Sequence, residues 1–239
     1  MKQAVVYMSQ ANGCFRSRHP TRLLVEKRTF MTTCAIVCAS GQALPPILVS
    51  PRKYYKDFLF TTAPPGSLGL ANPSGCMNTE LFVQVMQHFI KHTYVSLENP
   101  TLLIMDNHES HLSIDALDLI KKSGVSVLTL HPHITVEMQP VNVGLNGPFK
   151  TYYNSAVDSW LRRNPGKQMT IYNFAECVGQ EYQKAMTPIN IATAFKKCGI
   201  FPYNADVFED IDLMPSAVTD REQPGSSSKL PISASSDHL

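Results

Sequence analysis

The sequence predicts an α/β domain in which helices flank a mixed β-sheet. Two β-branched, apolar segments lie close together near residues 29–50, and a regular alternation of helix and strand patterns runs from residue 78 to residue 130. Three amphipathic segments follow and end near residue 197. The chain has 239 residues, 44% of them hydrophobic, which is enough to bury the core of one domain.

The first strands are expected at residues 29–39 and 44–50. The first run, TFMTTCAIVCA, is apolar on both faces, and Ser40 and Gly41 separate it from the second run. This pattern predicts a hairpin within a buried sheet. Residues 51–76 mix aromatic, basic and turn-forming residues, a composition that predicts a surface loop.

The clearest helix pattern covers residues 78–94. Asn78 is suited to be the N-cap, and Glu80 lies in the first turn, where a negative charge is favourable. The apolar residues that follow recur at helical spacing; they are Leu81, Phe82, Val85, Met86, Phe89 and Ile90. These features predict an amphipathic helix with one face in the core.

Residues 101–130 have the pattern of a strand, a helix and a second strand. The expected bounds are 101–105, 113–122 and 125–130, with Gly124 ending the helix. Such a unit predicts two parallel strands with a right-handed connection. Helices are expected next at 143–163, 171–184 and 188–197, and the last has Pro188 in its first turn.

Composition limits the partners that the chain can have. Lys and Arg number 21 against 19 Asp and Glu, so contacts with nucleic acid would depend on local patches. No apolar run is long enough to span a membrane, and neither a membrane nor a small-molecule substrate is expected. The six cysteines form no CxxC pair, and the first residues do not have the pattern of a secretory signal; both features favour a reducing, intracellular compartment.

Asp106 is the first candidate for chemistry, because it ends an apolar strand and opens the polar run DNHESH. Ligands of α/β folds collect at the carboxyl edge of the sheet. The alternative is that Asp106 caps the following helix or forms a turn with its own backbone. Further along the chain, Asn142 lies in the run QPVNVG, ahead of Gly147 to Lys150 at the head of a helix. Two polar positions arranged in this way would converge.

Several stretches, taken together and in order, resemble the DDE-type transposase family. They are residues 39–41 with 45–46, 75–77, 102–111 (LLIMDNHESH), 132–133, 139–140, 147–150 (GPFK) and 199–204. The resemblance is to the pogo/Tigger branch, to which centromere protein B and the jerky-like proteins are related. It covers about residues 26–210. The expected organisation is a remnant N-terminal segment at 1–28, a DDE-type domain at 29–210 and a disordered tail at 215–239.

The resemblance implies an RNase H-like core in which three acidic residues hold two divalent ions, Mg²⁺ or Mn²⁺. By position, Asp106 is the second acid and a metal ligand, whereas the third acid falls at Asn142, an amide. The family's first acid lies on the central first strand, and nothing in residues 1–28 reproduces its motif. Glu26 ends an apolar run, but as a charged residue leading into the next strand it is better explained without a metal. Glu137 is a further acid near the expected site.

We therefore expect a transposase-derived, catalytically degenerate domain that is truncated at the N-terminus, lacks a helix-turn-helix module and is nuclear. Its expected partner is DNA, bound weakly and without sequence specificity through Arg52, Lys53, Lys56, His108 and Lys150. The tyrosines interleaved with these cations at 54, 55, 152 and 153 would either stack on bases or pack inward, and inward packing is favoured.

Two alternatives for the function and one question about the sheet stay open. A non-catalytic scaffold would bind a protein partner through residues 51–76. A histidine-rich metallohydrolase would hold one metal between Asp106 and four histidines, namely His108, His111, His131 and His133. For the sheet, residues 1–7 either fill the place of the central strand imperfectly or leave an unpaired edge.

Overall fold

The computed structural model describes residues 4–13, 31–55, 62–106, 113–130 and 135–208. The chain divides into two compact units, residues 1–204 and residues 205–239. In the second unit the described element is a short 3₁₀ helix, η4 (Ala205–Val207). The predicted tail at 215–239 lies outside the described residues, as do Glu26, Lys56 and His108.

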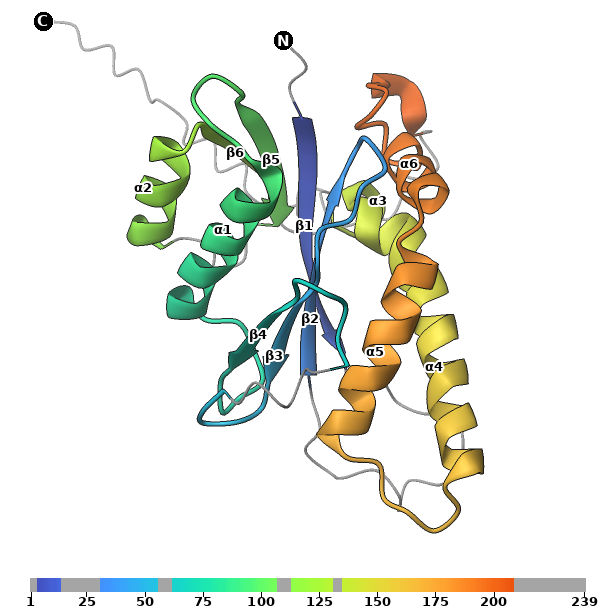
Figure 1. Ribbon diagram of the computed structural model, residues 1–239. Helices are drawn as coiled ribbons and strands as arrows, with labels where there is room; N and C mark the ends of the chain where they lie inside the picture. The colour runs from blue at the N-terminus through green and yellow to red at the C-terminus, as the bar shows by residue number, and fades with distance from the viewer. Residues whose placement is uncertain (1–3, 14–30, 56–61, 107–112, 131–134, 209–239) are drawn as a thin grey trace, which may run out of the picture. The chain divides into compact units, whose positions relative to one another are not determined.

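The first unit is built on a mixed sheet with the strand order β4-β3-β2-β1-β5-β6 (Figure 1). Its strands are β1 (Ala4–Gly13), β2 (Met31–Cys38), β3 (Ile47–Ser50), β4 (Leu68–Ala71), β5 (Thr101–Asp106) and β6 (Val125–Leu130). Strand β2 is antiparallel to both of its neighbours, and all other neighbouring pairs are parallel. The predicted fold class, a mixed sheet with flanking helices, is therefore confirmed.

Helices cover both faces of the sheet (Figure 1). One face carries α1 (Thr79–Thr93) and α2 (Ile114–Lys122), and the other carries α4 (Asn146–Arg163), α5 (Ile171–Ala185) and α6 (Pro188–Lys197). The alternation of β2 divides the core between these layers, because Cys34 and Ile36 join the α1 side whereas Ala35 and Val37 join the α4 side. Among the described helices, none is long and apolar enough to cross a membrane.

Asn78, Gly124 and Pro188 have the roles at helix ends that the sequence predicts. The Asn78 side chain accepts a hydrogen bond of 2.9 Å from the amide of Leu81, which caps α1. Gly124 adopts a left-handed φ of 81°, and a Cβ atom there would lie 2.4 Å from the carbonyl oxygen of Ser96. Thr187 caps α6, and Pro188 occupies its first turn.

The loop prediction for residues 51–76 was wrong in one part, because it contains β4. This strand pairs in parallel with β3, from Leu68 opposite Ile47 to Ala71 opposite Ser50. Strand β4 has four residues, one of them Gly69, and turn formers flank it on both sides. It is stabilised by pairing with β3, a strand earlier in the sequence, and a local sequence pattern does not reveal that pairing.

The N-terminal segment fills the central place in the sheet. Strand β1 runs from Ala4 to Gly13 and is thus longer than the expected segment. It pairs with β2 on one side, ending with Gly13 opposite Met31, and with β5 on the other, ending with Tyr7 opposite Ile104. Of the two arrangements expected for this segment, the structure has the filled central position and not an unpaired edge.

Candidate functional site

Asp106 is the last residue of β5 and lies where that strand reaches the carboxyl edge of the sheet. On one side it is paired with Leu130, the last residue of β6. On the other side, β5 is paired with the central strand β1 as far as Ile104, which lies opposite Tyr7 and two residues before Asp106. Strands β1, β3, β4, β5 and β6 run in the same direction, so their carboxyl ends face the same edge, as predicted for a ligand site.

The negative charge of Asp106 affects a side chain on β2, the strand that lies on the other side of β1 from β5. Cys34 of β2, which is fully buried, pairs with Gln10 of β1. Burial raises the pKa of the Cys34 thiol to about 12, and the charge of Asp106 adds to the increase. Gln10 is thus the β1 residue paired with Cys34, and β1 contains neither Asp nor Glu.

Asn142 lies in η3 (Val141–Leu145), a single turn of π-helix between α3 (Thr135–Met138) and α4. Val141 and Leu145 anchor η3 in the core cluster that also contains Ile104, two residues before Asp106. The turn contacts β1, which pairs with β5, so Asn142 and Asp106 belong to the same region of the fold. Sequence patterns predicted a continuous helix from residue 143, and the π-turn before α4 corrects that boundary.

The π-turn depends on a close approach between η3 and α6. A Cβ atom on Gly144 would lie 2.6 Å from the Cβ of Ala194 and 3.0 Å from its Cα. Both Ala194 and the neighbouring Phe195 are fully buried. A glycine at this position therefore lets the backbone of η3 rest on α6, which sets where Asn142 stands.

The Asn142 amide takes part in a chain of three amide side chains. Its Nδ2 donates to Oε1 of Gln139 over 2.6 Å, and its Oδ1 accepts from Nδ2 of Asn146 over 2.7 Å. Gln139 is buried, with 2% of its surface exposed, so it holds the inner end of this chain firmly. Both ends of the Asn142 amide are thus engaged along η3 and the start of α4.

The donor atoms that the described residues bring to this edge do not fit a pair of divalent ions. Two such ions held close together require several carboxylates to offset their charge. Asp106 supplies one, whereas β1 and η3 contain no acidic residue, and Glu137 on α3 is exposed. No group of three His, Cys, Asp or Glu side chains in the described ranges is arranged to hold a metal ion. The histidines of the metallohydrolase alternative, His108, His111, His131 and His133, lie outside those ranges.

The basic residues expected to contact nucleic acid are spread over two elements. Arg52 and Lys53 follow β3 at the same edge of the sheet as Asp106, with β2 and β1 between them and β5. The Nζ of Lys53 lies 5.4 Å from the ring centroid of Tyr54. Lys150 is exposed on α4.

The expectation that the nearby tyrosines pack inward holds for only one of them. Tyr153 is 1% exposed and belongs to the core cluster on the α4 side. Tyr54, Tyr55 and Tyr152 are 69%, 40% and 41% exposed, so inward packing was wrong for these three. Side chains that alternate with cations on a surface stay partly solvated, since the cations cannot be buried with them.

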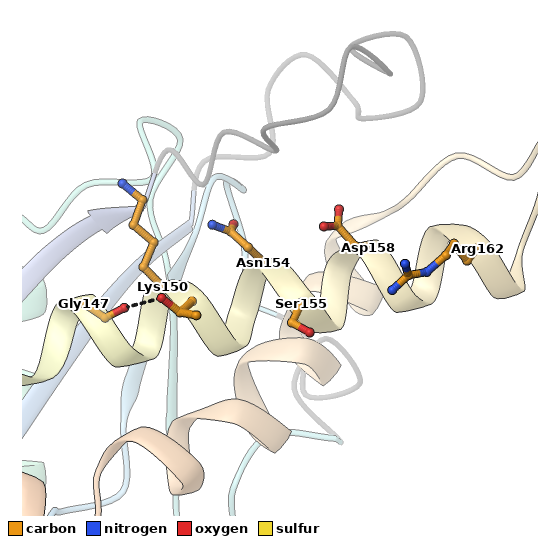
Figure 2. Close-up of a pocket in the computed structure, with 7 residues that line it drawn as sticks. Gly147, Lys150, Asn154, Ser155, Asp158 and Arg162 are labelled. Atoms are coloured by element: carbon orange, nitrogen blue, oxygen red, sulfur yellow. Dashed lines mark hydrogen bonds between the residues drawn. The ribbon is translucent and has the colours of Figure 1, made fainter.

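The sequence patterns missed a groove of about 480 Å³ along the outer face of α4 (Figure 2). The described residues that line it come from α4 and, except for Gly147, have polar side chains: Gly147, Lys150, Thr151, Asn154, Ser155, Asp158 and Arg162. The available signal was polar residues at four-residue spacing, which a search for apolar periodicity does not detect.

Comparison with known proteins shows the family to which the chain belongs. Residues 26–195 match the family model described as DDE superfamily endonuclease, which covers more than half of the chain. The chain belongs to the DDE superfamily endonucleases. The predicted family is thereby confirmed at the level of the DDE superfamily.

The chain is similar to a curated protein and to several solved structures. The protein called MFS-type transporter clz9, from Cochliobolus lunatus, is 26% identical over 197 residues, which are 82% of this chain and 21% of that protein. The chain thus spans about a fifth of that relative's length.

Among solved structures, the chain is similar to the Mos1 mariner paired end complex with Mn. The two sequences are 12% identical, and the match has a TM-score of 0.48 and covers 81% of this chain and 52% of the Mos1 chain. The Mos1 catalytic domain is also 12% identical to this chain. That match has a TM-score of 0.40 and covers 83% of this chain and 81% of the Mos1 chain. Structures of that catalytic domain with Raltegravir are described with Mn or with Mg.

Proposed function

We propose that this chain is a transposase-derived DDE domain of the pogo/Tigger branch that binds DNA and has lost the ability to cut it. The observation that carries the proposal is the composition of the carboxyl edge around Asp106. The central strand β1, which pairs with the strand that ends at Asp106, has no acid anywhere along its length. The position resembling the third acid is Asn142.

The charge that the described residues bring to this edge is too small for a two-metal reaction. Two divalent ions carry four positive charges, of which a bound phosphodiester offsets one, and Asp106 contributes one further negative charge. An amide oxygen can coordinate a cation but adds no charge. Asn142 Oδ1 would also have to leave its hydrogen bond with Asn146 in order to coordinate a metal. Weak metal occupancy and an uncleaved substrate follow from this donor set.

DNA binding is supported by exposed cations and not by net charge. Arg52 and Lys53 stand at the same edge of the sheet as Asp106, and Lys150 stands on α4. The formal net charge of the chain is only +2, so binding would rest on these local contacts to phosphate. Contacts of this kind give weak affinity, little dependence on base sequence and a steep dependence on salt. The nucleus is the compartment in which such a domain would meet DNA.

Two measurements on the purified chain test the proposal. Fluorescence anisotropy with labelled DNA duplexes of several sequences should give similar, weak affinities that fall steeply from low to physiological salt. Titration with Mn²⁺, followed by electron paramagnetic resonance, should show weak binding that is lost in Asp106→Ala. Tight, salt-tolerant binding to one sequence, or two strongly held manganese ions per chain, would contradict the proposal. Zinc retained after washing with a chelator would favour a metallohydrolase instead.

A protein-binding scaffold is the second candidate, and the exposed tyrosines after β3 favour it. Tyr54 and Tyr55 present large aromatic surfaces to solvent, as is common in protein interfaces. Replacing both with serine separates the candidates. A drop in affinity for single-stranded DNA would mean that the rings stack on bases, whereas unchanged affinity would leave this surface for a protein partner.

A further inference from the structure

A row of polar residues continues from the candidate site along α4. Every fourth residue from η3 onward is polar, and these residues are Asn142, Asn146, Lys150, Asn154, Asp158 and Arg162. Residues four apart on a helix are neighbours whose directions differ by about 40° around the axis, so the row forms a stripe that winds slowly around the helix. In Figure 2, Lys150, Asn154 and Asp158 project from the same side of the helix, and Arg162 follows them along it. The stripe therefore begins at the amide chain of Asn142 and ends near the end of α4.

The other side of α4 is occupied by the core, which fixes how the stripe is presented. Phe149, Tyr153 and Val157 are buried against the sheet and the neighbouring helix α5. Arg163 is turned away from the stripe, because its Nε donates to the carbonyl of Ser159, and it lines a different groove with Glu176. Lys150 and Arg162 are both exposed and are the cations of the stripe.

The separation of these two cations matches a feature of B-form DNA. Lys150 and Arg162 are twelve positions apart, which at 1.5 Å and about 100° per residue separates their Cα atoms by about 18 Å along the axis and by about 120° around it. The major groove of B-DNA is about 12 Å wide, and adding roughly 3 Å for each phosphate puts the phosphates on its two sides about 18 Å apart. We infer that α4 bridges the major groove of duplex DNA, with Lys150 on one phosphate strand and Arg162 on the other.

The remaining groups of the stripe suit a position over the groove. Asn154 and Asp158 lie between the two cations and would stand above the groove floor, away from both phosphate rows. The groove is about 8.5 Å deep, so these short side chains do not reach the base edges of a duplex bridged in this way. The contacts are then limited to phosphate groups, which agrees with DNA binding that does not depend on base sequence. Asp158 is the only acid in α4 and weakens the attraction modestly.

The inference rests on the proposed DNA binding and is tested with variants of the full chain. The probes are a labelled B-form DNA duplex of mixed sequence, an RNA duplex and a DNA single strand, each measured by anisotropy over a range of salt concentrations. Lys150→Gln and Arg162→Gln should each lower the slope of log affinity against log salt by about 0.9, which is about eightfold in affinity at 0.1 M salt. The double variant should lose roughly 60-fold on the same basis. Asp158→Asn should raise the affinity about twofold.

The RNA duplex separates bridging from simple charge attraction. The major groove of A-form RNA is narrow and deep, so the two cations cannot straddle it in the same way. On RNA the double variant should therefore lose no more than the roughly eightfold expected of a single phosphate contact. Equal losses on RNA, on single strands and on B-form DNA would overturn the bridging geometry.

A matched control and the wild-type measurement separate the possible failures. Lys121→Gln removes an exposed lysine from α2, on the opposite face of the sheet, and should leave binding unchanged. Binding by the wild-type chain that is insensitive to Lys150→Gln and Arg162→Gln would overturn the role of α4 alone. Absence of any binding by the wild-type chain would overturn the proposed DNA-binding function itself.

Discussion

Replacing Gly144 with alanine should destabilise the chain, because it forces apart the two elements that place Asn142. The new Cβ would lie 2.6 Å from the Cβ of Ala194, whereas carbon atoms in contact prefer about 3.5–4.0 Å. The neighbouring backbone Cα, at 3.0 Å, leaves no flexible atom to give way. Overpacking of this kind costs about 1–3 kcal/mol of unfolding free energy. For a unit of this size, that is a fall in Tm of about 2–12 °C.

Gly147→Ala provides the matched control, three residues further along the chain. Nothing lies within 4 Å of a Cβ at Gly147, and this residue is inside α4. The same substitution should therefore stabilise the protein by about 0.4–1 kcal/mol, by restricting the unfolded chain. Thermal unfolding followed by circular dichroism measures both variants. Equal Tm values for the two variants, or a higher Tm for Gly144→Ala, would refute the packing of η3 on α6.

Two further predictions concern the core. Tyr182→Phe removes a buried hydrogen bond of 3.1 Å from the tyrosine hydroxyl to the carbonyl of Leu44. The free energy of unfolding should fall by about 1–3 kcal/mol. Urea unfolding should then show a lower midpoint with an unchanged slope. Cys34 should resist iodoacetamide at pH 8 in the folded protein while the exposed Cys76 reacts, which peptide mass mapping can follow. The pKa of Cys34 is raised to about 12, so its thiolate fraction at that pH is on the order of 10⁻⁴ and grows only as the pH approaches 12. Labelling of Cys34 at the rate of Cys76 would contradict this burial.

The helices and the buried strands were predictable because their signals are local. The apolar spacing from Leu81 to Phe89 and the N-cap Asn78 are sufficient to define α1. The position of Asp106 at a strand end was likewise visible, because the apolar run of β5 stops there. Such features depend on neighbours within a few residues, which the sequence lists directly.

The elements that were missed depend on partners distant in the sequence. Strand β4 exists because Leu68–Ala71 pairs with Ile47–Ser50, and a four-residue segment with a glycine has no pattern of its own. The π-turn at Val141–Leu145 depends on contact with Ala194 of α6. Neither contact can be read from spacing along the chain.

The amide chain around Asn142 was also beyond local patterns. Resemblance to a family identified Asn142 as the third position, but it did not show that Gln139 and Asn146 engage both ends of its amide. In Asn142→Asp, the donor to Gln139 Oε1 is lost, and Gln139 would have to turn its own amide over to donate to the new carboxylate. The substitution therefore restores a charge at that position only if this buried side chain rearranges.

Cleavage of supercoiled plasmid in the presence of Mg²⁺ or Mn²⁺ is the most direct test of the account. The wild-type chain, Asn142→Asp and the contamination control Asp106→Ala should give the same background, because the central strand supplies no acid beside Asp106. Nicking by the wild-type chain that disappears in Asp106→Ala would contradict the account, since another acid would then fill the missing role. Nicking by Asn142→Asp alone would contradict the claim that the first acid is absent.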